Sequence, residues 1–75
     1  MHHRRASLQL RHVLAVMRHE LRHGRMTPEL ADRASDVVEE TAIAIEPEPD
    51  AALRELLDSA RAEIEKSRRV ATNDH

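Results

Sequence analysis

Residues 23–29 read HGRMTPE, and this short stretch decides the fold because it ends one helix and begins the next. Gly24 suits the left-handed position that follows a helix C-terminus. Thr27 is a good N-cap, and Pro28 fits the first helical position after it. A connection this short favours two antiparallel neighbours. The stretch therefore predicts a helical hairpin.

On both sides of this turn, apolar residues recur at spacings of three and four, the period of an amphipathic helix. They predict helices at about residues 5–23 and 28–45. The segment EPEPD follows, and it is expected to be extended because each residue before a proline is pushed out of the helical region. The same apolar period then predicts a third helix at about residues 50–70. No stretch has the alternation of a strand.

The chain is therefore expected to be all-α: a helical hairpin plus a third amphipathic helix, as a three-helix bundle or an intertwined helical dimer. Residues 1–75 are expected to form a single small helical domain, with residues 71–75 as a disordered tail.

The side chains available for a core are small. The chain has 75 residues, no Phe, Tyr or Trp, and no Cys to form a disulfide. A core of this kind supplies about 3–5 kcal/mol, and small scaffolds usually need a further constraint. We therefore predict a homo-oligomer held together by aliphatic helix faces. The predicted interface residues are Leu10, Leu14, Met17, Leu21, Leu53, Leu57, Ala60 and Ile64.

Charge is distributed unevenly along the chain. The overall net charge is −2, but residues 1–25 carry +5, residues 26–50 carry −7 and residues 51–75 are neutral. This division favours the first third lying against the second, or each facing a partner of opposite charge.

Two charged surfaces follow from this pattern. Arginines of the first helix are expected to form a ridge that contacts a polyanion or an acidic partner: Arg4, Arg11, Arg18 and Arg22. Acids of the second helix are expected to contact a basic partner: Asp32, Asp36, Glu39 and Glu40. For each surface the competing interpretation is an ordinary solvated face. The absence of aromatic residues argues against stacking on single-stranded nucleic acid.

Residues 19–23 read HELRH, which matches the H-E-x-x-H pattern in which two histidines on a helix bind Zn²⁺. His19 and His23 are thus candidate metal ligands, although Glu29 stands where one large class of such enzymes has a third histidine. The same HELR resembles the opening of the phosphoacceptor box of sensor histidine kinases. That resemblance would make His19 the phosphorylated residue. It covers four residues, and the family's Thr-Pro follows only after an insertion.

The leading hypothesis is a non-enzymatic helical interaction module of the adaptor, inhibitor or co-chaperone type, with no cofactor. Its expected partners are a second copy of itself and another protein. The alternative is a regulatory protein that binds nucleic acid through the arginine ridge, and a metal or phosphotransfer site at His19 is weaker. No apolar run approaches the ~18 residues of a membrane span, so we expect no membrane partner and a cytoplasmic location.

Overall fold

The computed structural model describes residues 4–45 and 50–73, and these form three α-helices. They are α1 (Arg4–Arg22), α2 (Pro28–Ile45) and α3 (Ala51–Asn73). All three pairs of helices pack against each other within the one chain, so the prediction of an all-α fold is confirmed and the arrangement is a three-helix bundle.

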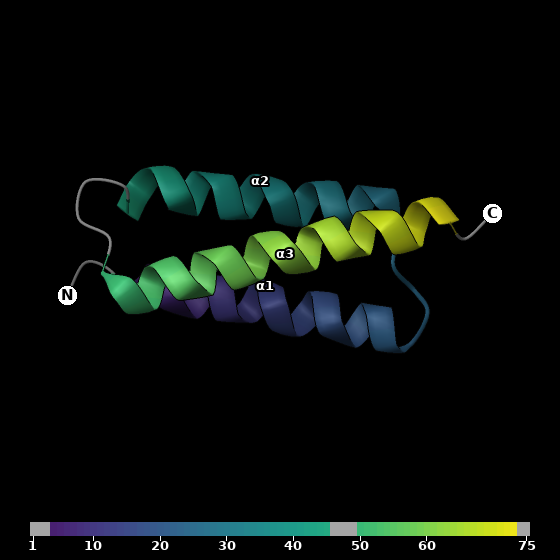
Figure 1. Ribbon diagram of the computed structural model, residues 1–75, viewed down its shortest axis with the longest axis horizontal. Coiled ribbons are helices and arrows are strands. Elements are labelled where there is room, and N and C mark those ends of the chain that lie inside the picture. The colour runs from purple at the N-terminus through teal and green to yellow at the C-terminus, as the bar shows by residue number, and fades with distance from the viewer. Residues whose placement is uncertain (1–3, 46–49, 74–75) are drawn as a thin grey trace.

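The bundle is narrow and long, with extents of 42 × 17 × 16 Å. Figure 1 shows the chain running along the long axis three times, so that α1 and α3 are parallel and α2 is antiparallel to both. In the part of the chain that the structure describes, no helix is both apolar and long enough to span a membrane.

The turn between α1 and α2 has the geometry that its sequence predicts. Gly24 has a φ of 66°, in the left-handed region that favours glycine. The Gly24 N–H donates to the Leu21 carbonyl at 3.2 Å and the Arg25 N–H donates to the Glu20 carbonyl at 2.8 Å. This pair of bonds is a Schellman motif, which satisfies carbonyl groups that the end of α1 would otherwise leave unbonded.

Side chains cap the other two helix starts. Thr27 Oγ1 accepts a hydrogen bond from the Leu30 N–H at 3.1 Å, which fixes the start of α2. Asp50 Oδ1 accepts one from the Leu53 N–H at 2.7 Å and does the same for α3. A side-chain acceptor at this position satisfies one of the free N–H groups of a first helical turn. The segment 46–49 lies outside the described residues.

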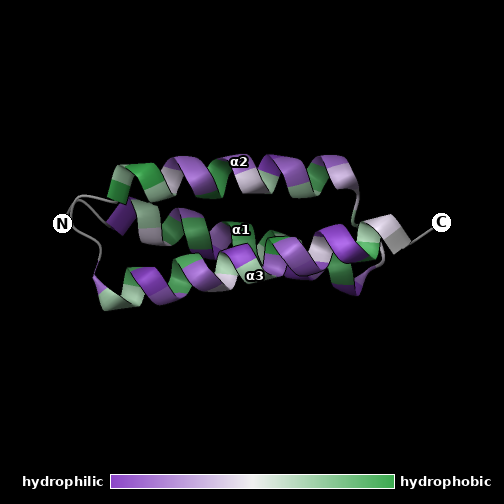
Figure 2. Cartoon of the chain, turned by 45° about the horizontal axis from the view of Figure 1, so that its top comes forward, coloured by the Kyte–Doolittle hydropathy of each residue, from purple (hydrophilic) through white to green (hydrophobic). Residues whose placement is uncertain are grey.

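The core runs the length of the bundle, where the apolar sides of the three helices meet. Figure 2 shows hydrophobic and hydrophilic residues alternating along each helix, as amphipathic helices require. The buried hydrophobic residues form one cluster: Ala6, Leu10, Val13, Leu14, Met17, Met26, Ala31, Ala34, Val38, Ile45, Leu53, Ala60, Ile64 and Ala71. Met26 comes from the α1–α2 turn and was not predicted from the sequence.

Two polar side chains are buried in this core without leaving a polar atom unbonded. Thr41 Oγ1 donates to the Val37 carbonyl and Ser67 Oγ donates to the Glu63 carbonyl, each at 2.8 Å. Each bond runs to the residue four positions earlier in the same helix. Small polar residues can therefore occupy the core here and let the helices approach closely.

The end of α3 corrects a prediction. Residues 71–73 were expected to belong to a disordered tail, but α3 continues to Asn73. Ala71 is only 5% exposed, because it extends the buried side of α3 by one further turn beyond Ser67. Residues 74–75 lie outside the described part of the chain.

Leu10→Ala and Leu8→Ala test whether the core is formed within one chain. Leu10 is 0% exposed and Leu8 is 59% exposed on the same helix. We expect Leu10→Ala to lower the free energy of unfolding by about 2–5 kcal/mol, and Leu8→Ala by less than about 0.5 kcal/mol. Urea denaturation followed by circular dichroism at low protein concentration measures both. Equal losses in the two variants would contradict the packing described.

Candidate functional site

The residues predicted to form an oligomer interface are core residues instead. Six of them are 0–6% exposed: Leu10, Leu14, Met17, Leu53, Ala60 and Ile64. Leu21 and Leu57 are partly buried and pack against the same cluster. The three apolar helix sides cover one another, so six of the eight are hidden within one molecule, whereas Leu21 and Leu57 keep part of their surface exposed. Their role in an oligomer interface stays a prediction.

The predicted arginine ridge is exposed. Arg4, Arg11, Arg18 and Arg22 are all solvent-accessible on α1. Arg18 Nε lies 3.9 Å from Glu63 Oε2 of α3, a long and largely exposed contact of small energetic value. Within the described residues, the other three arginines form no ion pair.

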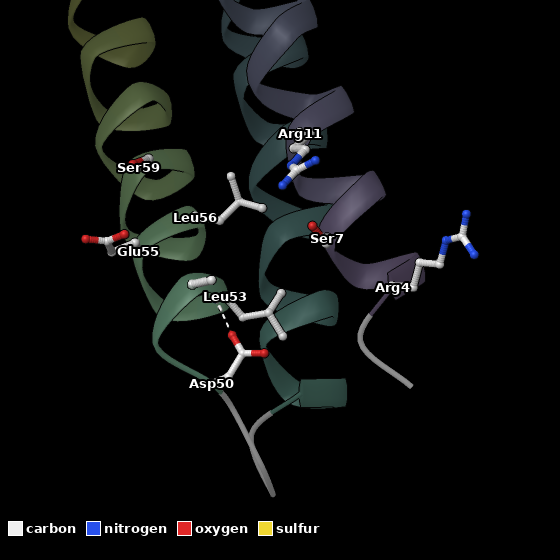
Figure 3. Close-up of a pocket in the computed structure, with 9 residues that line it drawn as sticks. Arg4, Ser7, Arg11, Asp50, Leu53, Glu55, Leu56 and Ser59 are labelled. Atoms are coloured by element: carbon white, nitrogen blue, oxygen red, sulfur yellow. Dashed lines mark hydrogen bonds between the residues drawn. The ribbon is translucent and has the colours of Figure 1, made fainter. Parts of the chain in front are cut away.

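An open groove of about 620 Å³ separates the ridge from α3. Arg4, Ser7 and Arg11 line one wall, and the other is lined by Asp50, which caps α3, and by residues of α3 that include Glu55. Figure 3 shows Leu53 and Leu56 between the walls, while Arg4 and Glu55 point away to opposite sides. The charged groups therefore do not converge on one point as catalytic groups must.

The acidic residues of α2 fall into two groups. Glu39 accepts two hydrogen bonds from Arg61 of α3, at 3.0 and 2.9 Å, and Asp32 accepts one from Arg68 at 3.1 Å. These two acids, predicted to contact a basic partner, are already paired within the chain. Asp36 and Glu40 are exposed, and no ion pair involves them in the described part of the chain.

The Glu39–Arg61 pair displaces the pKa values of both groups. Hydrogen bonds from the guanidinium are the main reason that the pKa of Glu39 lies below its usual value; burial opposes them, and the positive charge of Arg61 adds a smaller lowering effect. The same bonds raise the pKa of Arg61. Both side chains are about half exposed, at 53% and 46%, so the pair is a structural surface contact.

The predicted histidine pair is also exposed, with His19 in the last turn of α1 and His23 just after the helix ends. The rings of His19 and His23 lie with centroids 4.4 Å apart. Arg25 Nη2 donates to His19 Nε2 at 3.2 Å, and Arg25 Nε donates to Glu20 Oε2 at 3.0 Å. A metal ion at this nitrogen would face the positive charge of Arg25. The described residues hold no group of three or more His, Cys, Asp or Glu that could bind a metal ion.

The cross-helix ion pairs all involve α3. Arg18 of α1 reaches α3, and the two paired acids of α2 also reach α3. No ion pair joins α1 to α2 among the described residues, although both helices belong to the same hairpin. The basic α1 does lie against the acidic α2, as one of the two expectations had it, but no ion pair between described side chains accompanies this packing. Because α3 carries charges of both signs, it forms ion pairs with α1 through an acid and with α2 through arginines.

Each hairpin helix keeps a strong charge of one sign. With five arginines and one glutamate, α1 carries +4 when its histidines are neutral. With five acids and one arginine, α2 carries −4. Between them, the surface has a shallow apolar groove of about 140 Å³. Its lining residues are His12, Val13, Val16, Met17, Leu30, Arg33, Ala34 and Val37.

We call the side of the bundle that carries this groove, with the outer sides of α1 and α2 that flank it, the hairpin face. The sequence interpretation missed it because it assigned only one apolar side to each helix. Val16 lies off the main apolar side of α1, and Leu8 and Ile43 are exposed at 59% and 70%. These off-pattern apolar residues were the available signal.

Substitution of Arg61 tests the cause of the Glu39 pKa shift. We expect Arg61→Gln to return the pKa of Glu39 toward about 4.3, as measured by NMR titration of its side-chain carboxyl. The pKa of Glu39 is lower in the folded state than in the unfolded state. The pair therefore stabilises the fold at pH values above the unfolded-state pKa, and this stabilisation is lost as the pH falls through the folded-state pKa. The contribution should stay below about 1 kcal/mol because the pair is exposed.

Arg54→Gln is the matched control, since Arg54 is a second exposed arginine of α3 with no bond to Glu39. It should leave the pKa of Glu39 depressed. A Glu39 pKa unchanged by Arg61→Gln would contradict the assignment.

Comparison with known proteins does not assign the chain to a family. No protein family, no curated protein and no solved structure matches the chain. Its function is therefore inferred from the surface of the bundle itself.

Proposed function

We propose that this chain is a small non-enzymatic helical interaction module, of the adaptor, inhibitor or co-chaperone type, that binds through the hairpin face. The observation that carries the proposal is the apolar groove between α1 and α2, which has partly exposed valine and leucine side chains and charged residues at its edge and beside it. An apolar centre flanked by charges is the usual composition of a protein-binding surface.

Of the three sides of the bundle, the hairpin face has the fewest ion pairs between its two helices, counted over the described residues. The seam between α1 and α3 has the Arg18–Glu63 contact, and the seam between α2 and α3 has the Arg61–Glu39 and Arg68–Asp32 pairs. The seam between α1 and α2 has an apolar groove and no ion pair among the described residues. Arg33 lines this groove and Arg5 and Glu40 line a second one between the same helices, and none of the three forms an ion pair in the part of the chain that the structure describes.

The groove and the charges would have different roles in binding. Burial of Val16, Leu30 and Val37 against a partner would supply affinity, because apolar surface would leave water. The charged residues Arg5, Arg33 and Glu40 would orient the partner and accelerate its association, as charges at the edge of an interface commonly do. This mechanism replaces the predicted one, in which the core-forming sides of the helices made the contact.

The position of the perturbed groups supports a binding role over a catalytic one. Within the described residues, Glu39 and Arg61 are the groups whose pKa values are displaced, and they neutralise each other on the surface. Perturbed groups at an active site lie in a cleft, where burial and neighbouring charges adjust them for reaction.

Polyanion binding is the second candidate, favoured by the exposure of Arg4, Arg11 and Arg22. Two acids oppose it, because Asp50 before α3 and Glu55 within α3 line the groove beside Arg4 and Arg11. A phosphate backbone along the ridge would meet these carboxylates. The proposal therefore favours a protein partner.

Site-specific photocrosslinking in the native cell tests the proposal. A photoreactive amino acid at His12, an exposed position at the edge of the groove, should crosslink to protein. The same residue at Ala62, an exposed position of α3, is the matched control and should give little product. Equal crosslinking from the two positions, or none from either, would contradict the proposal. Nuclease-sensitive products from His12 would favour the polyanion candidate.

A further inference from the structure

We infer that the groove between α1 and α3 is a second binding surface, which receives an amphipathic helix of another protein with acids along one edge and bases along the other. This groove lies on a different side of the bundle from the groove of the hairpin face, so the inference goes beyond the proposed function. Three features of the groove carry it: a positive wall, a negative wall and an apolar floor between them.

The wall of the groove on α1 is positively charged. Arg4 and Arg11 line it, both are exposed, and neither forms an ion pair within the described residues. They are separated by two helical turns, or about 10.5 Å along the axis, so they lie on the same side of α1. Arg18 follows at the same interval and has only the 3.9 Å contact with Glu63. Positive charge therefore repeats along this edge with a helical period.

The opposite wall is negatively charged over the same length. Asp50 and Glu55 line it, and neither acid forms an ion pair in the part of the chain that the structure describes. In Figure 3, Arg4 and Glu55 point outward to opposite sides, so their charged groups lie at the two rims of the groove. The groove therefore presents positive charge at one rim and negative charge at the other.

The floor between the walls is apolar. Leu53 and Leu56 lie there (Figure 3), and Leu56 is only partly buried although it packs against the core. Leu8, which is 59% exposed, is the fourth residue after Arg4 and the third before Arg11, so it lies beside both at the rim of the positive wall. An occupant that covered Leu8 and Leu56 would remove apolar surface from water, which favours binding.

A helix is the occupant that fits this pattern. The groove lies between two parallel helices (Figure 1), and a further helix along it would complete a four-helix bundle. Its apolar side would cover the floor, and acids on one edge would follow the repeat of Arg4 and Arg11 because all α-helices share the same rise. Bases on the other edge would meet Asp50 and Glu55. Charges at the edges of a contact between helices select the partner and its direction in this way.

Designed peptides test the inference. The probe is a helical peptide of about 20 residues, with leucines along one side, glutamates on one edge of that side and lysines on the other edge. Added to the isotope-labelled chain, it should shift the backbone amide NMR signals of residues 4–11 and 50–59 more than those of residues 33–37 in the hairpin groove. Two control peptides keep the leucines and carry only glutamates or only lysines on both edges. Each should bind about tenfold or more weakly, because it meets one wall of its own sign.

Substitutions in the chain locate the contact. Arg11→Glu reverses the charge of an exposed position in the positive wall and should raise the dissociation constant for the mixed-charge peptide about tenfold or more. Arg33→Glu is the matched control, since Arg33 is an exposed arginine that lines the hairpin groove, and it should leave this constant unchanged. Circular dichroism verifies that each variant is folded.

The direction of the bound peptide gives the most specific outcome. Turning a helix end for end exchanges its two edges, so only one direction along the groove sets both edges against walls of opposite charge. A nitroxide at the peptide N-terminus should therefore broaden NMR signals at one end of the groove, near either Arg4 or Ser59. Exchanging the glutamates and lysines of the peptide should move the broadening to the other end.

An absence of shifts in the groove at about 1 mM peptide would overturn the inference. So would equal binding of the three peptides, or broadening that stays at the same end after the exchange. Weakening by Arg33→Glu that equals the effect of Arg11→Glu would place the peptide on the hairpin face instead. Groove signals that shift with the concentration of the chain alone would identify a second copy as the occupant. None of these outcomes affects the crosslinking from His12, which tests the proposed function separately.

Discussion

The mutual burial of three aliphatic helix sides is the interaction on which the rest of this structure depends. No aromatic ring is present to fill space, so the helices must approach closely enough for short side chains to touch. Small residues make this approach feasible, as shown by Ala31 and Ala60 at 0% exposure and by Ser67, whose hydroxyl bonds within its own helix. Once the three sides have covered one another, only the outer sides of the helices remain for function.

Local signals in the sequence predicted the helices well. Gly24, Thr27 and Asp50 act over a few residues through backbone geometry and capping bonds, and such effects are readable without knowing the fold. Packing between helices that are distant in the sequence was harder to predict. The choice between hiding the apolar sides within one chain and using them to bind another depends on how closely helices can pack. The prediction weighed the absence of large side chains and overlooked the small ones that compensate for it.

The charged surfaces show the same division between local and long-range information. Periodicity alone placed Arg4, Arg11, Arg18 and Arg22 on the exposed part of α1, and the structure agrees. Periodicity could not show that Glu39 and Asp32 pair with α3, because that depends on how α3 packs against α2. Nor could it reveal the hairpin face, which exists only when two helices lie side by side and Val16, which is off the apolar pattern of α1, shares a groove with Val37 of α2.

Folding alone gives no reason for the sorting of charge between α1 and α2. Acids at positions 32, 36 and 40 repeat every four residues along α2, a spacing at which like charges repel and cost the helix a few tenths of a kcal/mol per pair. Interspersed charges would avoid this cost and could form ion pairs across the α1–α2 seam, as they do at both seams of α3. Part of this sorted charge is compensated within the chain, because Arg18 of α1 and Asp32 and Glu39 of α2 all pair with α3. The mixed charges of α3 therefore allow two helices of opposite net charge to share one bundle without an ion pair between them in the described part of the chain.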